Sequence, residues 1–311
     1  MSLAQKTPLL AAALGVCACL AGCQDPVSPA AVLVEDELFI TGITVDESNV
    51  YFIRQEGIVK RVSIDGAPPT EIASGITDPR HIGVDNTHVY WATSTGTIAR
   101  AFKTGGDPEI LLEGEPDLRE MVVDNVAVYF TSGSDKAVRR LEKDQNALET
   151  LIVEDEGVLG PLAQQGGILY WSTLLENSTI KKMLATGGSA SPLVGGQGAV
   201  TTVSADPSFV YWGSQGDGKI TRLRPDGTDL TTVAVGQERV EKVIGDGKNV
   251  YWSSNDGSIA TAPVDGNAEP FVLSTGPEGL TFLAQDEGYL YSARYETGTI
   301  LVRPKVEDTA E

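Results

Sequence analysis

The sequence predicts an all-β fold, and three observations carry this prediction. A fragment of a hydrophobic residue, Tyr and usually an aromatic residue recurs along the chain, and its tyrosines stand 39 to 41 residues apart at Tyr51, Tyr90, Tyr129, Tyr170, Tyr211, Tyr251 and Tyr291. Each copy divides into four short apolar runs separated by turns rich in Gly, Asp and Asn. No stretch after the N-terminal region shows a sustained helical period. Seven four-stranded units at one period predict a seven-bladed β-propeller.

The first strand of each unit lies before the Tyr and ends in a fixed pattern. An apolar residue stands eight positions before the Tyr: Ile43, Ile82, Met121, Leu162, Val203, Val243 and Leu283. Five positions before the Tyr stand Asp46, Asp85, Asp124, Gln165, Asp206, Asp246 and Asp286. Six carboxylates in a ring are compatible with metal binding or acid–base chemistry. Their fixed place before a turn indicates instead that each caps backbone N–H groups, so we expect a structural role.

The second strand contains the repeated aromatic fragment, for example Val89-Tyr90-Trp91. Adjacent side chains of a strand point to opposite faces of the sheet. In a propeller both faces of a blade pack against neighbouring blades, so a continuously apolar strand is expected there. We therefore interpret the fragment as interblade packing and not as a ligand-recognition element.

The third and fourth strands follow a polar loop and a tight turn. The third strand contains Ile58, Ile98, Val138, Ile180, Ile220, Ile259 or Ile300, and turn pairs such as Asp65-Gly66 come after it. The seventh unit lacks a fourth strand, because the polar residues VEDTAE follow its third. Residues 31–35 match the fourth-strand pattern instead. We predict that they complete the last blade and close the ring.

The stretch PRHIGVDNTHVYWATSTGTI resembles the YWTD-type propellers of lipoprotein-receptor ectodomains. The resemblance extends over nearly all of the predicted propeller at the level of the repeat, and it implies the propeller fold. Two features differ: those propellers have six blades, and their Asp after Tyr-Trp-Thr is missing here. Hydroxyl residues occupy the equivalent places, and we expect them to supply part of the hydrogen bonding between blades: Thr93, Ser132, Thr173, Ser214 and Ser254.

The N-terminal region has the pattern of a secretory signal, with Lys6 followed by an apolar run from Leu9 to Ala21 that is too short to span a bilayer. The run ends in Leu20-Ala21-Gly22-Cys23, which resembles the lipobox of bacterial lipoproteins. The resemblance implies cleavage before Cys23 and acylation of its thiol, for example with palmitate. A plain signal peptide with an incidental Cys is the alternative.

These patterns divide the chain into four parts. We expect a lipoprotein signal peptide over residues 1–22, a tether over 23–30, the propeller over 31–304 and a C-terminal tail over 305–311. In lipoproteins an Asp directly after the acylated Cys favours the inner membrane, whereas Gln24 stands here. The predicted location is therefore the bacterial cell envelope, with a lipid anchor in the outer membrane rather than the inner membrane.

Charge and cysteine content exclude several function classes. The formal net charge of −20 disfavours binding to nucleic acid. Cys17 and Cys19 lie in the segment that would be removed, so Cys23 would be left alone in the mature chain. No disulfide, Cys-based metal site or catalytic thiol is then expected. We predict a monomer without a cofactor or a bound metal.

A binding site is predicted at one mouth of the central channel. In propellers the first strands line the channel, and one face carries the loops before them together with the loops between second and third strands. The latter vary in length here, and variable loops on a rigid scaffold are where binding usually resides. The candidate residues for ligand or partner binding are Arg80, His81, Arg119, Glu120, Asp217, Glu241, Lys242, Asn255, Asp256, Arg294 and Tyr295. The alternative is that they are solvated loop tips and ion pairs.

The sequence favours a non-enzymatic role, because no HExxH, GxSxG, Walker or Rossmann pattern occurs in a suitable context. We expect a membrane-anchored binding or scaffolding module that presents its loop-rich face to an envelope protein or polymer partner. The alternative is a channel-mouth hydrolase or lyase, with or without calcium. For that role the available groups are His81, Glu120 and Glu241.

Overall fold

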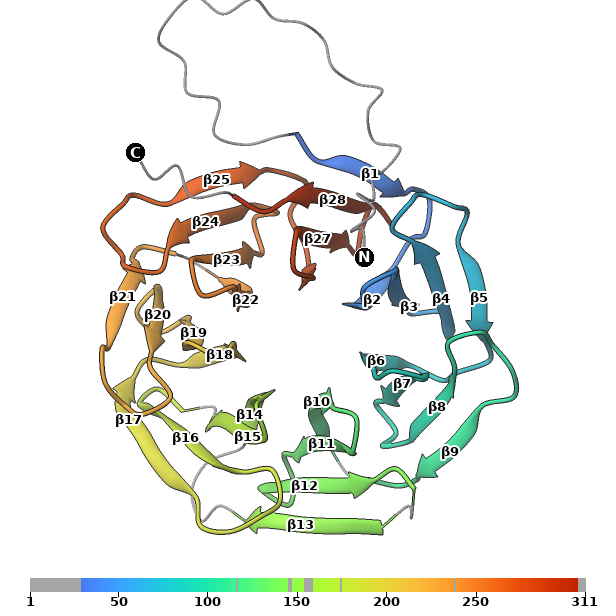
Figure 1. Ribbon diagram of the computed structural model, residues 1–311, viewed down its shortest axis with the longest axis horizontal. Coiled ribbons are helices and arrows are strands. Elements are labelled where there is room, and N and C mark those ends of the chain that lie inside the picture. The colour runs from blue at the N-terminus through green and yellow to red at the C-terminus, as the bar shows by residue number, and fades with distance from the viewer. Residues whose placement is uncertain are drawn as a thin grey trace, which may run out of the picture.

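The structure is a computed structural model that describes residues 29–306, apart from 116, 145–146, 154–158, 174 and 238. The predicted signal peptide, Cys23 and most of the tether and tail lie outside the described residues. Within them the fold is a ring of seven four-stranded antiparallel sheets around a central channel, and no residue is helical (Figure 1). The prediction of a seven-bladed β-propeller is confirmed. This part of the chain contains no helix with the length and hydropathy that a membrane span needs.

The first four blades follow one another along the chain. Blade 1 is β2 (Ile40–Val45), β3 (Asn49–Arg54), β4 (Ile58–Ser63) and β5 (Thr70–Ala73). Blade 2 is β6 (Pro79–Val84), β7 (His88–Thr93), β8 (Ile98–Phe102) and β9 (Glu109–Leu112). Blade 3 is β10 (Leu118–Val123), β11 (Ala127–Ser132), β12 (Ala137–Glu142) and β13 (Ala147–Val153). Blade 4 is β14 (Leu159–Gln165), β15 (Ile168–Thr173), β16 (Ser178–Leu184) and β17 (Ser191–Gln197).

The last three blades include the one that closes the ring. Blade 5 is β18 (Val200–Ala205), β19 (Val210–Ser214), β20 (Lys219–Leu223) and β21 (Thr231–Ala234). Blade 6 is β22 (Val240–Gly245), β23 (Asn249–Ser254), β24 (Ile259–Pro263) and β25 (Phe271–Ser274). Blade 7 is β26 (Thr281–Gln285), β27 (Tyr289–Arg294), β28 (Ile300–Pro304) and β1 (Ala31–Val34).

Ring closure follows the prediction. β1 pairs antiparallel with β28, so the N-terminal strand is the outermost strand of blade 7 (Figure 1). Val34 is 4% exposed and packs in the cluster between blades 7 and 1, together with Tyr291 and Phe52. The two ends of the described chain therefore share one blade, and β1 buries apolar surface while it pairs.

The core consists of seven apolar clusters, one at each interface between neighbouring blades. In six interfaces the repeated Tyr of one blade meets the aromatic residue of the next blade's fragment, as Tyr51 meets Trp91 and Tyr211 meets Trp252. All four Trp side chains are among the most deeply buried in the protein. The interpretation of VYW as interblade packing is confirmed.

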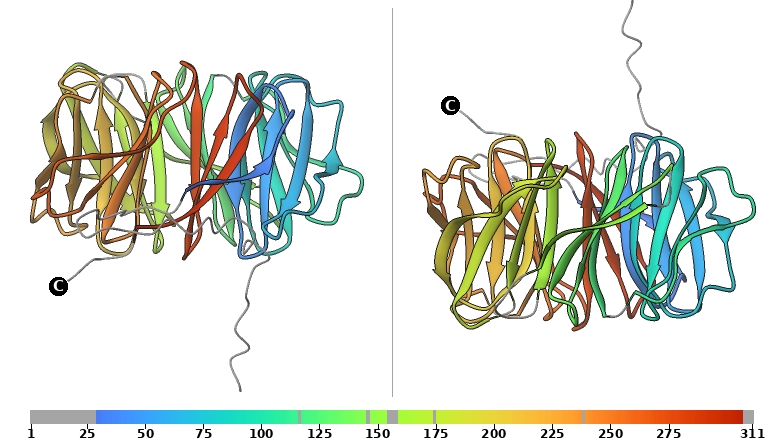
Figure 2. Two further views of the ribbon diagram at one scale, coloured as in Figure 1. Left: turned by 90° about the horizontal axis from the view of Figure 1, so that it is seen from above. Right: turned by 90° about the horizontal axis from the view of Figure 1, so that it is seen from below.

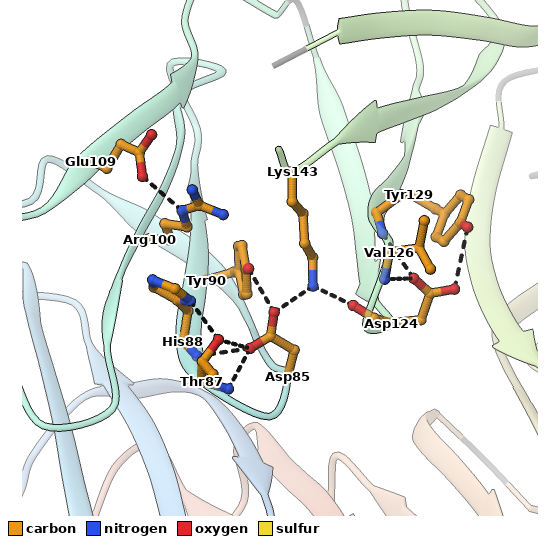
Figure 3. A network of polar contacts seen from close by, with 11 residues as sticks. Asp85, Thr87, His88, Tyr90, Arg100, Glu109, Asp124, Val126, Tyr129 and Lys143 are labelled. Atoms are coloured by element: carbon orange, nitrogen blue, oxygen red, sulfur yellow. Dashed lines mark hydrogen bonds and ion pairs between the residues drawn. The ribbon is translucent and has the colours of Figure 1, made fainter. Parts of the chain in front are cut away.

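The repeated Asp residues cap turns as predicted. In Asp85, Oδ1 accepts the backbone N–H of Thr87 and His88, and Oδ2 accepts the hydroxyl of Tyr90 at 2.7 Å (Figure 3). The same arrangement occurs at the other five positions: Asp46, Asp124, Asp206, Asp246 and Asp286. The repeated carboxylates are therefore occupied by their own turns.

Lysines on two neighbouring blades extend this motif. The Nζ of Lys143 lies 2.7 Å from Asp85 Oδ2, and it also donates to the carbonyl of Asp124, so it joins blades 2 and 3 (Figure 3). Lys103 of blade 2 reaches Asp46 of blade 1 in the same way, at 2.8 Å. These contacts link residues that the repeat alone does not place together.

Hydroxyl groups bond between blades, and the clear cases lie at another position of the repeat than the expected one. Thr93 bonds within its own loop, since its Oγ1 contacts Thr95 and accepts the backbone N–H of Thr97. One position earlier in the repeat, Thr131 and Ser253 donate to carbonyls of the next blade at 3.0 and 2.7 Å. Thr131 and Ser253 share a strand face with Tyr129 and Tyr251, which pack against the next blade, so their hydroxyls face that blade.

Candidate functional site

One face of the ring carries both sets of loops that the sequence places at the channel mouth. The loop between the second and third strands donates a backbone N–H to the segment before the first strand, as Ser94 does to Asp78 and Asn255 to Arg239, both at 3.0 Å. Equivalent bonds occur in blades 1, 3, 5 and 7. Figure 2 shows the strands running between this face and the opposite one. The face with these loops is called the mouth face below.

The first strands carry a β-bulge at the mouth face. The register with the second strand shifts at this end in six blades, for example between Pro79 and His81 and between Val240 and Lys242. A bulge inserts one extra residue and turns a side chain away from its regular direction. Two consecutive residues can therefore face the channel, although adjacent side chains of a regular strand point apart.

A cavity of about 270 Å³ occupies the channel at the mouth face. Its wall is formed by the first strands of blades 1, 2, 3, 6 and 7. Five of the predicted site residues line it: Arg80, His81, Glu120, Glu241 and Lys242. The structure thus gathers residues from β6, β10 and β22, which are up to 162 positions apart in the sequence (Lys242 minus Arg80). This space is called the mouth cavity below.

The charged groups of the mouth cavity differ in how they are held. Glu241 Oε1 accepts a hydrogen bond from Asn255 Nδ2 at 3.2 Å, and Glu120 Oε1 lies 3.8 Å from His81 Nδ1. Arg80 pairs with Asp78 at 3.0 Å and stays largely exposed. Lys242 has no hydrogen bond or ion pair to any residue that the structure describes. Its ammonium is therefore the cation of this cavity that is available to a ligand.

The mouth cavity keeps His81 neutral near pH 7. Burial lowers the pKa of His81 below its ordinary value, and the positive charges of Lys242 and Arg80 lower it further. The Glu120 carboxylate acts in the opposite direction but does not compensate. A neutral imidazole beside a carboxylate can accept a proton, which is the property of a general base.

One wall of the mouth cavity is apolar. It consists of Leu280, Phe282 and Leu283 from blade 7 and Ile43 from blade 1. None of these residues was expected to belong to a site, because each continues the ordinary apolar pattern of a first strand or of the segment just before it. A second cavity of about 290 Å³ lies further along the channel and shares Ile82, Met121, Val122 and Lys242 with the mouth cavity.

The other predicted residues lie outside the mouth cavity. Arg119 pairs with Asp117 at 2.7 Å on the exposed rim. Asp217 pairs with Lys219 at 2.7 Å and lines a separate hollow in the loops of blade 5. Asp256 caps the backbone N–H of Ser258. None of the three contacts the channel, so a role for them would require a partner that covers the rim.

Blade 7 provides the last two predicted residues. Arg294 is 8% exposed and donates to the carbonyl of Thr275 at 3.1 Å, so its guanidinium serves the local structure. Tyr295 packs against Phe39 with ring centroids 5.3 Å apart and the rings tilted by 57°, and its hydroxyl donates to Gln55. Phe39 has φ 63°, which is unusual for a bulky side chain. The sequence carried no signal for this aromatic pair on the rim.

Metal ligands do not gather in the described part of the chain. No group of three or more His, Cys, Asp or Glu side chains there has an arrangement that could hold a metal ion. The repeated Asp residues, which form the largest set of carboxylates, are each engaged by their own turn.

Comparison with known proteins gives fold-level likeness. No protein-family model and no curated protein sequence matches the chain. Among solved structures, virginiamycin B lyase from Staphylococcus aureus has a TM-score of 0.72 at 13% identity, covering 89% of this chain and 98% of that one. A catalytically inactive histidine-to-alanine variant of that lyase with quinupristin gives 0.73 at 13% identity, with the same coverage.

A third similar structure comes from a nidogen/laminin complex. It has a TM-score of 0.61 at 17% identity and covers 76% of this chain and 97% of that one. At these identities the three structures share the propeller fold with this chain.

Proposed function

We propose that this protein is a lipid-anchored lipoprotein of the bacterial envelope, and that its propeller is a non-enzymatic binding or scaffolding module. The mouth face receives a protein or polymer partner. The observation that carries the proposal is the mouth cavity, in which blades 2, 3 and 6 contribute charged side chains to one space while the repeated carboxylates are occupied elsewhere. The surrounding rim offers further charged and aromatic side chains on rigid loops.

The direction of β1 supports an arrangement in which the mouth face points away from the membrane. β28 runs from the mouth face to the opposite face, and Ala31 lies beside Val302 while Val34 lies beside Ile300. The chain before Ala31 therefore enters from the face opposite the mouth. A tether of eight residues spans at most about 28 Å when extended. An anchor on Cys23 would hold the far face near the bilayer and leave the mouth accessible.

Affinity capture from envelope membranes tests the binding role. The soluble form that starts at Gln24 is used as bait, beside a variant with Arg80, Arg119 and Lys242 changed to Ala. We expect a partner to be retained by the first bait and lost with the second. A matched control changes Arg61, Arg224 and Lys248 to Ala, which removes the same charge away from the mouth. Equal capture by all three baits would contradict the proposed binding face.

Acylation is tested separately, by mass spectrometry of the full chain from membranes. We expect a lipid-modified N-terminal Cys23, and we expect a Cys23→Ser variant to leave the membrane fraction. Recovery of unmodified Cys23 in a secreted chain would contradict the anchor.

A channel-mouth hydrolase or lyase is the second candidate, because a neutral His81 lies beside Glu120 in the cavity. The similarity between this chain and the lyase structures is a similarity of fold. Incubation with quinupristin, the ligand of one of those structures, followed by mass spectrometry tests this candidate with and without calcium. Turnover that is lost in His81→Ala would favour the enzyme, whereas quinupristin with unchanged chromatographic retention and fragmentation would count against this substrate class. The mass alone does not decide, because a lyase that opens a ring by elimination leaves it unchanged.

A further inference from the structure

We infer that the mouth cavity binds the carboxylate of a ligand that has an apolar body, and that the Lys242 ammonium is its anchor. The inference rests on the proposed function, because it names the chemistry of what enters the proposed binding face. The carboxylate belongs either to a small organic acid or to the C-terminus of a partner protein.

Lys242 is the cation that remains to be neutralised. It lies half-buried on β22 and lines both cavities of the channel. None of the described carboxylates lies within ion-pair distance of its Nζ, whereas the half-buried Lys60, Lys103 and Lys305 each have an acidic partner. A half-buried ammonium without a counter-ion gains most from an anion that enters the cavity.

The carboxylates of the cavity favour a monoanion. Glu241 is already bonded to Asn255, and Glu120 lies beside His81. Both remain negative charges close to the ligand site, so a doubly charged phosphate would be repelled more strongly than a carboxylate. A neutral His81 adds no positive charge that would offset this repulsion.

The wall next to Lys242 explains the apolar body. β26 follows β22 in the ring, as Figure 1 shows for blades 6 and 7, and it contributes Phe282 and Leu283 to the cavity. Leu280 stands just before β26 and is 41% exposed, so its side chain is available at the entrance. A ligand with a carboxylate on Lys242 therefore places its next few atoms against aliphatic and aromatic side chains. Such a wall excludes water and favours an apolar group.

Isothermal titration calorimetry on the full chain tests the inference. The probes are N-acetyl-L-leucine, its amide N-acetyl-L-leucinamide, and acetate. The first has both charge and apolar body, and each of the others lacks one. We expect N-acetyl-L-leucine to bind at least tenfold more tightly than either. Equal binding of the acid and the amide would overturn the inference.

Two substitutions of Lys242 distinguish the loss of its charge from an effect on folding. Lys242→Met should reduce the affinity for N-acetyl-L-leucine at least tenfold, whereas Lys242→Arg should keep the preference for the acid over the amide. Lys219→Met, which removes a rim cation that pairs with Asp217, is the matched control and should leave binding unchanged. Circular dichroism verifies that each variant is folded. Unchanged affinity in folded Lys242→Met would overturn the inference.

One peptide, compared with the small acid, identifies the source of the carboxylate. An acetylated pentapeptide that ends in a free Leu carboxylate should bind as tightly as N-acetyl-L-leucine if the ligand is a protein C-terminus. Binding of only the small acid would identify a free organic acid, and both results support the anchor. The capture experiment above is independent: a captured partner without any acid preference would leave the binding role standing and remove this inference.

Discussion

At the residue scale, the most informative side chains are repeated residues that cap their own turn and also contact the neighbouring blade. Asp85 caps its turn with Oδ1, while Oδ2 is shared between Tyr90 of its own blade and Lys143 of the next blade. The side chains of Asp85 and Lys143 are 7% and 4% exposed, so this is a buried ion pair between blades. Such a pair is strongly destabilising when one partner loses its charge.

The first prediction concerns this pair. Burial by itself would raise the pKa of Asp85, but the Lys143 ammonium and the donors of the turn outweigh it and hold the pKa well below its usual range. Asp85→Asn keeps an acceptor for the turn and removes the charge. We expect it to lower the free energy of unfolding by about 3 kcal/mol at pH 7. Asp46→Asn, at a more exposed pair with Lys103, should cost less.

The difference in unfolding free energy between wild type and Asp85→Asn should depend on pH, and the pKa of Asp85 gives the direction. A carboxyl whose pKa is lower in the folded state than the usual ~3.9 of the unfolded chain stabilises the protein above that pH. This stabilisation disappears as the pH falls through the folded value. Urea unfolding, followed by fluorescence of the buried Trp residues, should show the gap between wild type and Asp85→Asn narrowing below about pH 4. A constant gap from pH 7 to pH 2 would contradict the charge pair.

Two glycines give a second prediction at this scale. Gly57 and Gly66 both have φ 86°, a conformation that L side chains rarely adopt. A Cβ on Gly57 would stand 2.0 Å from the carbonyl oxygen of Ile76, whereas a Cβ on Gly66 would meet nothing within 4 Å. We expect Gly66→Ala to cost about 1 kcal/mol and Gly57→Ala at least about 3 kcal/mol in urea unfolding. Similar losses of unfolding free energy in the two variants would mean that the positive φ alone, and not the contact with Ile76, determines the cost.

At the element scale, β1 and the bulged first strands decide how the ring is closed and lined. β1 is short and lies at the outer edge of blade 7, yet one of its sides packs into the cluster between blades 7 and 1. The bulges on the first strands turn consecutive polar residues toward the channel in blades 2 and 6. The closing strand thus contributes to the interface of two blades, and the bulges bring side chains of different blades into one channel.

Alternate residues of β1 provide a matched test of ring closure. Val34 is 4% exposed in the interblade cluster, whereas Val32 is 53% exposed on the same strand. Val34→Asp buries an unpaired carboxylate and should lower the free energy of unfolding by about 3 kcal/mol or more. Val32→Asp should cost less than about 1 kcal/mol. Equal, small effects would show that β1 contributes little to the closed ring.

At the scale of the whole molecule, the ring brings together side chains from distant blades. Lys242 on blade 6 affects the pKa of His81 on blade 2, and Glu120 on blade 3 affects it in the opposite direction. The mouth cavity exists because the first strands of five blades converge on one space. The proposed ligand would contact several blades at once, so binding is a property of the closed ring.

The titration of His81 tests this geometry without a ligand. Nuclear magnetic resonance can follow His81 separately from His88, which is the other histidine of the chain. Because Lys242 lowers and Glu120 raises the pKa of His81, Lys242→Met should raise this pKa and Glu120→Gln should lower it. The pKa of His88 serves as the internal reference. If the pKa of His81 were the same in wild type and Lys242→Met, the proximity of Lys242 on blade 6 to His81 on blade 2 would be contradicted.

Much of the candidate site could be predicted from the sequence, but not its grouping. Arg80, His81, Glu120, Glu241 and Lys242 were expected at the mouth, and the structure places them around one cavity. Arg119 was expected with them and lies on the rim instead, where it pairs with Asp117. Whether a residue of a bulged strand faces the channel depends on its contacts with the neighbouring strand, which the spacing of residues does not encode.

The sequence by itself determined the number of blades, the order of their strands, the capped turns and the closing strand, which was predicted over residues 31–35 and is observed at Ala31–Val34. These features depend on local periodicity and on turn residues, which are visible in each copy of the repeat. Only the tertiary structure decided that Lys143 joins Asp85 and that Phe39 packs against Tyr295. It also decided that Lys242 stands in the channel without a counter-ion among the residues that the structure describes. These contacts join residues far apart in the chain, and the ring geometry sets their distances, so no local pattern can specify them.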